Sequence, residues 1–206
     1  MWMRSRETTR RLVAMAMLTA MALVLIVWVK VPLFTDYLIY EPGDVPVLIA
    51  GFLFGPAAGI AMAAVVAVVM ALITGLGGPF GAFMHFLATG ALVGVSSAIY
   101  WRWRTLGGAI ASLLVATLAT TGLMAWANLL LSPVFYGIPR EVVQATLWPA
   151  IIPFNLVKAS LNSVVTFALY KQTAVWLRRY MGVAGAEASR AVRPGGAAHL
   201  PKGGEH

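Results

Sequence analysis

In this chain of 206 residues, 60% are hydrophobic and only 11% are charged, and the mean hydropathy is +0.84, values that exclude an ordinary soluble domain. Because a membrane-spanning helix needs about 20 residues, we expect an all-α integral membrane protein of six transmembrane helices with short loops. The absence of cysteine excludes disulfides, thiol catalysis and thiolate metal sites.

Apolar runs place the predicted helices in chain order. The first run follows several arginines but continues through Trp28 without a small-residue cleavage site, so we interpret it as an uncleaved span rather than a signal peptide. Gly55-Pro56 separates a short second helix from the third. The predicted helices are 11–31, 46–55, 56–74, 81–101, 106–131 and 150–178. We therefore expect a six-helix membrane domain over 1–180 and a Gly-, Ala- and Pro-rich disordered cytoplasmic tail over 181–206.

Basic residues are distributed unevenly along the chain. Of the 15 lysines and arginines, 12 precede the first span, lie between the fourth and fifth, or follow the last. The positive-inside rule therefore predicts that both termini are cytoplasmic in a multi-pass protein of the bacterial plasma membrane. The net charge of +8 reflects this topology and does not indicate a nucleic-acid partner.

A stripe of polar side chains interrupts the last apolar run. Asn155, Lys158 and Asn162 are spaced i, i+3 and i+7, so they share one helical face, which Thr166 extends. A lysine at membrane depth costs about 2.5 to 3.5 kcal/mol on insertion scales, which makes it a candidate functional residue. This stripe indicates a site that binds a ligand from within the membrane.

Other polar groups are expected at the same depth. Asn128 lies near the outer end of the fifth helix, His85 lies near the outer start of the fourth, and the loop over 33–45 closes above them. Amide groups combine donors and acceptors, and nearby aromatic rings offer flat apolar faces, a mixture suited to a planar ring with polar edges. The loop contributes Tyr40, Glu41 and Asp44 to this predicted outward-facing pocket.

Other interpretations of these residues stay open. Membrane asparagines and lysines also bond to neighbouring helices or extend to the interface, and His85 could pack helices or cap a loop. Ser96 and Ser97 lie three helical turns from His85, and no phosphate-binding loop is present, so we predict no enzymatic activity. No second histidine or carboxylate lies at ligand spacing beside His85, so we predict neither a metal site nor a cofactor.

Two separated motifs carry a resemblance to a known family. Residues 44–52 read D-V-P-V-L-I-A-G-F and residues 54–59 read F-G-P-A-A-G, which resembles the D-[IV]-P-A-L-I-G-G-F and [LF]-G-P-x-x-G signature of substrate-binding S components of energy-coupling-factor (ECF) vitamin transporters. Residues 153–158 (P-F-N-L-V-K), 161–163 (L-N-S) and 169–171 (L-Y-K) resemble a second stretch of that family. The resemblance spans about residues 11 to 178, at six-helix length.

The chain is most similar to the riboflavin-specific type within this family. The resemblance implies that Asn128, Asn155 and Lys158 contact the flavin while the loop from Tyr40 to Asp44 closes over it. One segment and one single residue depart from the family pattern. Residues 39–44 read I-Y-E-P-G-D in place of [LK]-x-[DN]-[FY]-S-D, and His85 replaces a common asparagine. Folate, a thiamine precursor or pantothenate therefore remain alternative substrates.

The resemblance also implies partners for this chain. An S component captures its vitamin and assembles with a transmembrane coupling subunit and two ATP-binding subunits, which agrees with the missing phosphate loop. Ala16 and Ala20, spaced i, i+4, match the docking face that this family presents to the coupling subunit. The small residues of the third predicted helix, at positions 59, 63, 67 and 71, could serve docking or internal packing. A small secondary transporter or a structural membrane subunit are the alternative functions.

Overall fold

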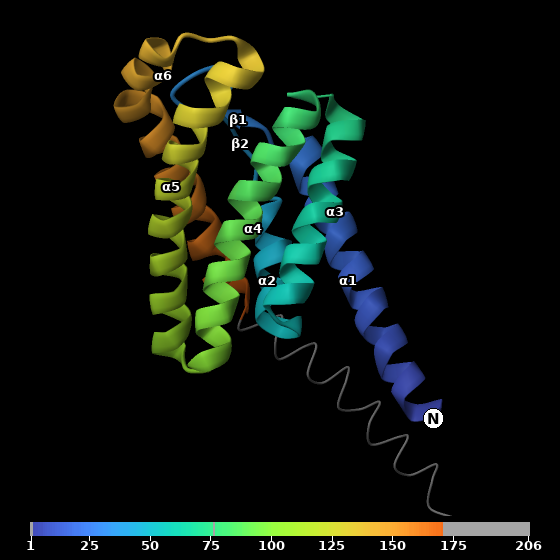
Figure 1. Cartoon of the computed structure of the whole chain (residues 1–206). Helices are drawn as coiled ribbons and strands as arrows, with labels where there is room; N and C mark the ends of the chain where they lie inside the picture. The colour runs from blue at the N-terminus through green and yellow to red at the C-terminus, as the bar shows by residue number, and fades with distance from the viewer. Residues whose placement is uncertain (1, 76, 171–206) are drawn as a thin grey trace, which may run out of the picture. The chain divides into compact units, whose positions relative to one another are not determined.

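The computed structural model describes residues 2–75 and 77–170, with side chains from residue 8 onward. The predicted tail at 181–206, the domain boundary at 180 and the last eight residues of the sixth predicted helix lie outside the described residues. The rest of the chain is almost entirely helical, as the composition indicated (Figure 1).

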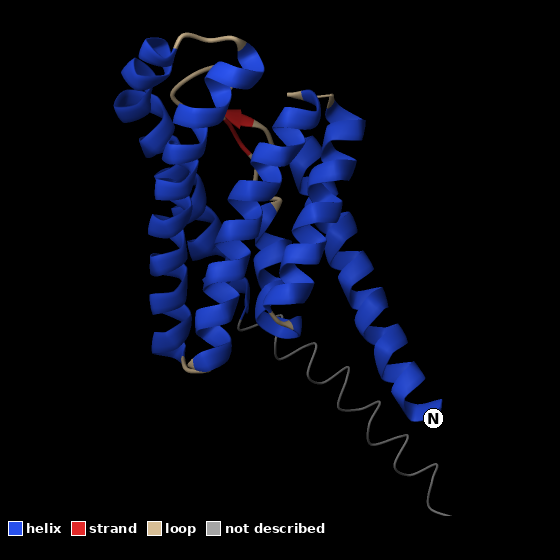
Figure 2. Ribbon diagram, viewed as in Figure 1, coloured by secondary structure: helices blue, strands red, loops and turns tan. Residues whose placement is uncertain are grey.

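The elements follow one another with short connections. Helix α1 (Trp2–Trp28) leads into a small antiparallel hairpin, in which Val31 pairs with Tyr40 and Pro32 with Ile39. Figure 2 shows the two strands of this hairpin, β1 (Val31–Pro32) and β2 (Ile39–Tyr40), among the helices. The remaining elements are α2 (Asp44–Phe54), α3 (Pro56–Thr74), α4 (Gly78–Arg102), α5 (Leu106–Tyr136), α6 (Arg140–Thr146) and the π-helical turn η1 (Leu147–Ile151).

After η1 the chain continues as an α-helix through residue 170, and we call the continuous segment Arg140–Tyr170 the final helix. Five helical segments in the described part of the chain are long and apolar enough to cross a membrane: Thr8–Trp28, Pro56–Thr74, Gly78–Arg102, Leu106–Tyr136 and Arg140–Tyr170. The second predicted helix, α2, has 11 residues and is too short to meet that criterion. The protein is therefore an all-helical, multi-pass membrane protein, with five candidate spans among its described residues.

Several helix boundaries differ from those expected. The final helix begins ten residues before position 150 and continues past Pro149 and Pro153, which we expected to mark its start. Proline removes one backbone N–H and normally breaks the i to i−4 ladder, but the wider turn of η1 contains Pro149 without ending the helix. Helix α5 likewise continues past Pro133 to Tyr136. The β1–β2 hairpin was not expected in the loop.

Helix α4 occupies the centre of the packing. It contacts α2, α3 and α5, while α1 packs against α2 and α3 (Figure 1). Helices α2 and α3 approach closely because a Cβ on Gly59 would lie 2.9 Å from the Cα of Gly51, and a Cβ on Gly51 would collide with Ser97 of α4. Gly55, at φ 99°, forms the sharp corner between α2 and α3. These small residues place α2 deep among its neighbours, with ten of its 11 residues buried.

The connections divide between two ends of this helical unit. The hairpin, the α3–α4 turn and the α5–α6 connection lie at one end, and the α2–α3 corner, the α4–α5 turn and the N-terminus lie at the other (Figure 1). The start of α2 and the first part of α4 therefore approach the same end as the hairpin. This arrangement positions the polar residues described next.

Candidate functional site

A buried ion pair joins the loop after β2 to the final helix. The Nζ of Lys158 donates a hydrogen bond to the Oε1 of Glu41 at 3.0 Å, and the two side chains are only 13% and 10% exposed. Residues 117 positions apart in the sequence thus form a direct contact. Because each charge would be costly to bury alone, the pairing explains how Lys158 is retained in an apolar helix.

Asp44, in the first turn of α2, makes a second set of buried contacts. Its Oδ1 accepts a hydrogen bond from the Oγ1 of Thr89 at 2.6 Å, and its Oδ2 accepts one from the Nδ2 of Asn162 at 2.9 Å. All three residues are at most 3% exposed. The carboxylate also lies at a helix N-terminus, where the helix dipole favours negative charge. Asp44 therefore ties α2 to both α4 and the final helix.

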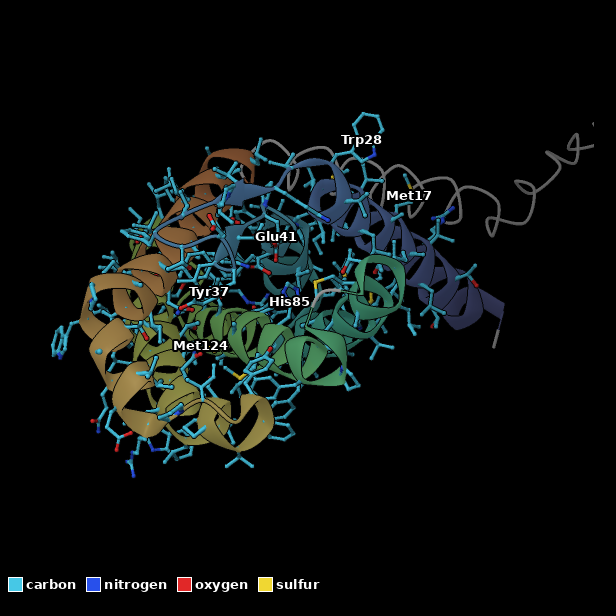
Figure 3. All side chains as sticks on the ribbon, turned by 90° about the horizontal axis from the view of Figure 1, so that it is seen from above. Met17, Trp28, Tyr37, Glu41, His85 and Met124 are labelled. Carbon is cyan, nitrogen blue, oxygen red and sulfur yellow. The ribbon has the colours of Figure 1, made fainter. Side chains whose placement is uncertain are left out.

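His85 lies between the two carboxylates. Its Nδ1 is 3.5 Å from the Oε1 of Glu41, and its Nε2 is 4.0 Å from the Oδ1 of Asp44. Seen along the helices, Glu41 and His85 lie inside the bundle, whereas Trp28 projects outward (Figure 3). We call Glu41, Asp44, His85, Thr89, Lys158 and Asn162 the ionic network.

The carboxylates near His85 come from outside its own helix. None occurs at ligand spacing in its own segment, and it is the loop after β2 and the start of α2 that bring two within 4.0 Å. Local spacing reports only neighbours on the same helix, and these partners come from other elements. Among the residues that the structure describes, no cluster of three histidine, cysteine, aspartate or glutamate side chains has a geometry suited to a metal ion.

Tyr40 borders the ionic network from strand β2. Burial raises the pKa of its phenol above the usual value, the negative charge of Asp44 raises it further, and the positive charge of Lys158 acts in the opposite direction. The group therefore remains a neutral hydroxyl at physiological pH. A neutral phenol can donate a hydrogen bond beside two carboxylates without adding a further negative charge.

The two predicted amide residues are placed differently from Lys158. The Nδ2 of Asn128 bonds to the carbonyl of Met124, and the Nδ2 of Asn155 bonds to the carbonyl of Ile151, both at 2.8 Å. Ser132 additionally donates to the Oδ1 of Asn128 at 3.2 Å. Within the described ranges, neither amide bonds to the ionic network. The structure thus brings Glu41, Asp44, His85 and Lys158 close together, and leaves Asn128 and Asn155 bonded to their own helices.

Two members of the ionic network were not among the predicted site residues. Thr89 follows His85 by four positions and so lies on the same face of α4, a spacing that could have indicated a shared role. Asn162 was recognised only as part of the polar stripe. Its Oδ1 and the hydroxyl of Thr166 have no hydrogen-bond partner in the described structure, although both residues are completely buried. The polar stripe therefore continues into the interior beyond the ionic network.

The predicted docking residues lie on a different surface. Ala16 and Ala20 are exposed on α1, together with the neighbouring Met17 and Met21, which are 62% and 54% exposed. Figure 3 shows Met17 on the outside of the bundle. By contrast, the small residues of α3 at positions 59, 63 and 67 are buried against the rest of this chain. The two small-residue stripes therefore face opposite surroundings.

Comparisons with known proteins agree with this architecture. Residues 10–170 match the family model described as "ECF transporter, substrate-specific component". The chain is 32% identical over 180 residues to the riboflavin transporter RibU of Staphylococcus aureus (strain TCH60), covering 84% of this chain and 95% of that protein. It is 28% identical over 180 residues to the riboflavin transporter FmnP of Bacillus subtilis (strain 168), covering 82% of this chain and 95% of that protein.

A solved structure of an ECF transporter S component has a similar fold. The S component of a bacterial ECF transporter superposes with a TM-score of 0.71 at 34% sequence identity, covering 83% of this chain and 99% of that chain. The family is one of transporter subunits and not of enzymes. The family model matches most of the chain, and the solved structure has the same helical fold. This chain therefore belongs to the family of substrate-specific components of ECF transporters.

Proposed function

We propose that this protein captures riboflavin from the outer side of the bacterial plasma membrane and delivers it inward as the S component of an ECF importer. Two relatives that share about a third of its sequence are riboflavin transporters, which supports the choice of vitamin. The observation that carries the proposal is the buried Lys158–Glu41 pair, because it places an ammonium group inside the bundle below a loop.

The proposed topology has six membrane segments. Five long helices supply full spans, and α2 enters the membrane as a short sixth segment that does not need to cross the whole bilayer. The N-terminus lies at the same end as Arg102 and Arg104 after α4, an arrangement that supports a cytoplasmic location for that end. The hairpin and the ionic network would then lie toward the outside, where the vitamin arrives.

The proposed vitamin site lies beside the ionic network. Lys158 donates to a carbonyl or ring nitrogen of the flavin, and Asn128 and Asn155 offer amide groups to its polar edge. The segment from Tyr40 through Glu41 to Asp44 closes over the ligand, and His85 borders it from α4. Helix α5 and the final helix support this arrangement because the hydroxyls of Thr117 and Ser163 lie 3.2 Å apart and join the two helices below the site.

The proposed partners are a transmembrane coupling subunit and two ATP-binding subunits. Helix α1 supports this assembly, since only 11% of its most apolar 18-residue window is buried, against 50% for α5. We propose that Ala16 and Ala20 mark the position where the coupling subunit approaches, because small exposed residues let another helix come close. The rest of the exposed apolar surface contacts lipid.

A binding measurement tests the vitamin. Protein purified in detergent from riboflavin-containing cells should carry a yellow chromophore, and added riboflavin should lose its fluorescence when it binds to ligand-free protein. A colourless preparation that also fails to quench added riboflavin would eliminate flavin as the substrate and leave the family assignment intact. Folate, a thiamine precursor and pantothenate would then be tested in the same assay.

A further inference from the structure

Each ring nitrogen of His85 faces a different carboxylate. Nδ1 points to Glu41 at 3.5 Å and Nε2 lies 4.0 Å from Asp44, while the His85 side chain is only 6% exposed. A neutral imidazole has a single N–H and can donate to one partner, whereas the protonated ring donates from both nitrogens. While Lys158 is bonded to Glu41, a neutral ring is sufficient, because its Nε2 also lies 3.5 Å from the Oγ1 of Thr89. A second proton on the ring would find a carboxylate facing it on either side.

The charges around His85 do not balance when its ring is neutral. Glu41 and Asp44 contribute two negative charges, Lys158 contributes one positive charge, and Tyr40 is a neutral phenol. Helices α3 and α5 contain no Asp, Glu, Lys, Arg or His, and Tyr136 is the titratable residue of α5. The charged residues of α1 all fall within positions 4–11, near the N-terminal end of that helix. While Lys158 pairs with Glu41, the group carries one net negative charge, and withdrawal of Lys158 toward a ligand would leave the two carboxylates without a cation, which a proton on His85 would offset.

The distances distinguish the two cations of the ionic network. Lys158 is bonded to Glu41 at 3.0 Å, whereas His85 is 3.5 Å from the same oxygen, beyond the roughly 2.7 to 2.9 Å typical of a charge-assisted hydrogen bond. In this arrangement Lys158 is bonded to Glu41, and His85 is close but not bonded to it. A small movement would let His85 replace Lys158 as the partner of Glu41.

Ligand binding creates the need for such a replacement. According to the proposed function, Lys158 donates to the flavin, so its bond to Glu41 must weaken or break when the vitamin enters. The Glu41 carboxylate would then be buried without its counter-ion, which is strongly unfavourable. Neither amide of the predicted site carries a charge that could compensate, and His85 is the titratable group that lies next nearest to the Glu41 carboxylate after Lys158 in the described structure.

We propose that His85 is a positioning residue that takes up a proton from the outer solution as riboflavin binds, and holds Glu41 while Lys158 turns from Glu41 to the ligand. This inference rests on the proposed function, because it requires Lys158 to contact the vitamin. Its consequence is that affinity rises as the pH falls, since binding and protonation favour each other reciprocally. Over the pH range in which His85 is neutral in the free protein and protonated in the complex, the dissociation constant should increase about tenfold for each pH unit, as expected for one proton taken up per ligand.

The experiment measures proton uptake directly. Riboflavin is titrated into the detergent-solubilised full chain by calorimetry, in buffers that differ in ionisation enthalpy, between about pH 5.5 and 8.5, where an unperturbed histidine titrates. The wild-type protein should take up about one proton per riboflavin in the part of this range where His85 is neutral in the free protein and protonated in the complex. His85→Gln keeps a polar side chain of similar size but cannot titrate in this range. It should bind without proton uptake, with an affinity that stays constant across the pH range.

A second variant keeps the test decisive if His85→Gln does not fold. Glu41→Gln leaves His85 in place but removes the carboxylate that needs compensation, so proton uptake should also disappear in this variant. Wild-type binding with no proton uptake, or equal uptake in wild type and His85→Gln, would overturn the role of His85 alone. Absence of riboflavin binding at every pH would instead overturn the proposed function. An unchanged affinity in Lys158→Met would overturn the contact between Lys158 and the vitamin, and with it the exchange of partners proposed for Glu41.

Discussion

The ionic network and the outer face of α1 differ in burial and in polarity. The ionic network gathers polar side chains from the loop, α2, α4 and the final helix into contacts that exclude solvent, with Asp44 at 3% exposure. The outer face of α1 has no buried charge and consists of exposed apolar and small residues. Under the proposed function this difference corresponds to two tasks, because a ligand site requires convergent polar groups and a docking surface requires only a smooth, accessible face.

The small residues of α1 and α3 sharpen this distinction. Both helices have alanines at four-residue spacing, but Ala63 and Ala67 of α3 are buried within the described structure, while Ala16 and Ala20 are exposed. On α1 the buried positions are instead Ala22 and Ile26. The stripe on α3 is thus accounted for by packing within the chain, and the stripe on α1 is available to a partner.

The largest expected effect comes from filling the face of α1. Ala20→Trp should abolish riboflavin uptake in cells that contain the coupling and ATP-binding subunits, because a bulky ring holds the two helices apart. Riboflavin affinity of the isolated chain should remain unchanged, since Ala20 points away from the bundle. Uptake of labelled riboflavin and co-purification of the coupling subunit measure the first effect, and fluorescence quenching measures the second.

Ala119→Trp is the matched control because Ala119 is an exposed alanine on α5. This variant should retain both uptake and binding. If Ala20→Trp is folded but loses riboflavin binding, the face of α1 contributes to the vitamin site, and the separation of the two surfaces is wrong.

A smaller effect is expected from the cation of the ionic network. Lys158→Met keeps an apolar side chain of similar length and removes the charge, so membrane insertion should be at least as favourable. Loss of a hydrogen bond from a charged group costs about 1.5 to 3 kcal/mol, so riboflavin should bind about ten- to a hundredfold more weakly. Ligand titration and thermal unfolding of the same preparation measure affinity and stability.

Lys30→Met provides the matched control, because Lys30 is an exposed lysine between α1 and β1. It should leave affinity unchanged. Unchanged affinity together with a lowered melting temperature in Lys158→Met would show that the Lys158–Glu41 pair serves only to hold the final helix to the loop.

The smallest effect is expected from the neutral amides. Asn155→Leu and Asn128→Leu each remove an uncharged hydrogen-bonding group worth about 0.5 to 1.5 kcal/mol, which corresponds to roughly two- to twelvefold weaker binding. Both amides already donate to their own helix backbones, which limits what each can contribute to a ligand. Combined with Lys158→Met, each change should have less than its separate effect if all three groups contact one ring.

Gln144→Leu is the control for these substitutions, since Gln144 is an exposed amide on α6. Strictly additive losses in the double variants would indicate that Asn155 and Asn128 do not share a ligand with Lys158. Titration of riboflavin into the single and double variants gives this answer directly.

The sequence predicts some helices more accurately than others. The apolar runs predicted α3 and most of α4 because a long span without charges has few alternatives in a membrane. Pro149 and Pro153 led to a late start for the final helix, since local rules assign prolines to helix ends and do not anticipate the π-helical turn. The resemblance of residues 44–59 and 153–171 predicted the family, which the matching family model and the solved structure confirm.

What the sequence by itself determined is the class of protein, its helices and the face of the final helix that contains Lys158, because hydropathy and helical periodicity are local properties. Tertiary structure alone decided that Lys158 pairs with Glu41 and that Asp44 bonds to Thr89 and Asn162. It likewise placed two carboxylates at the ring of His85. These contacts join residues more than 40 positions apart, and the physical reason is that a buried charge is stabilised by whichever partners the helix packing brings near it, regardless of their separation along the chain.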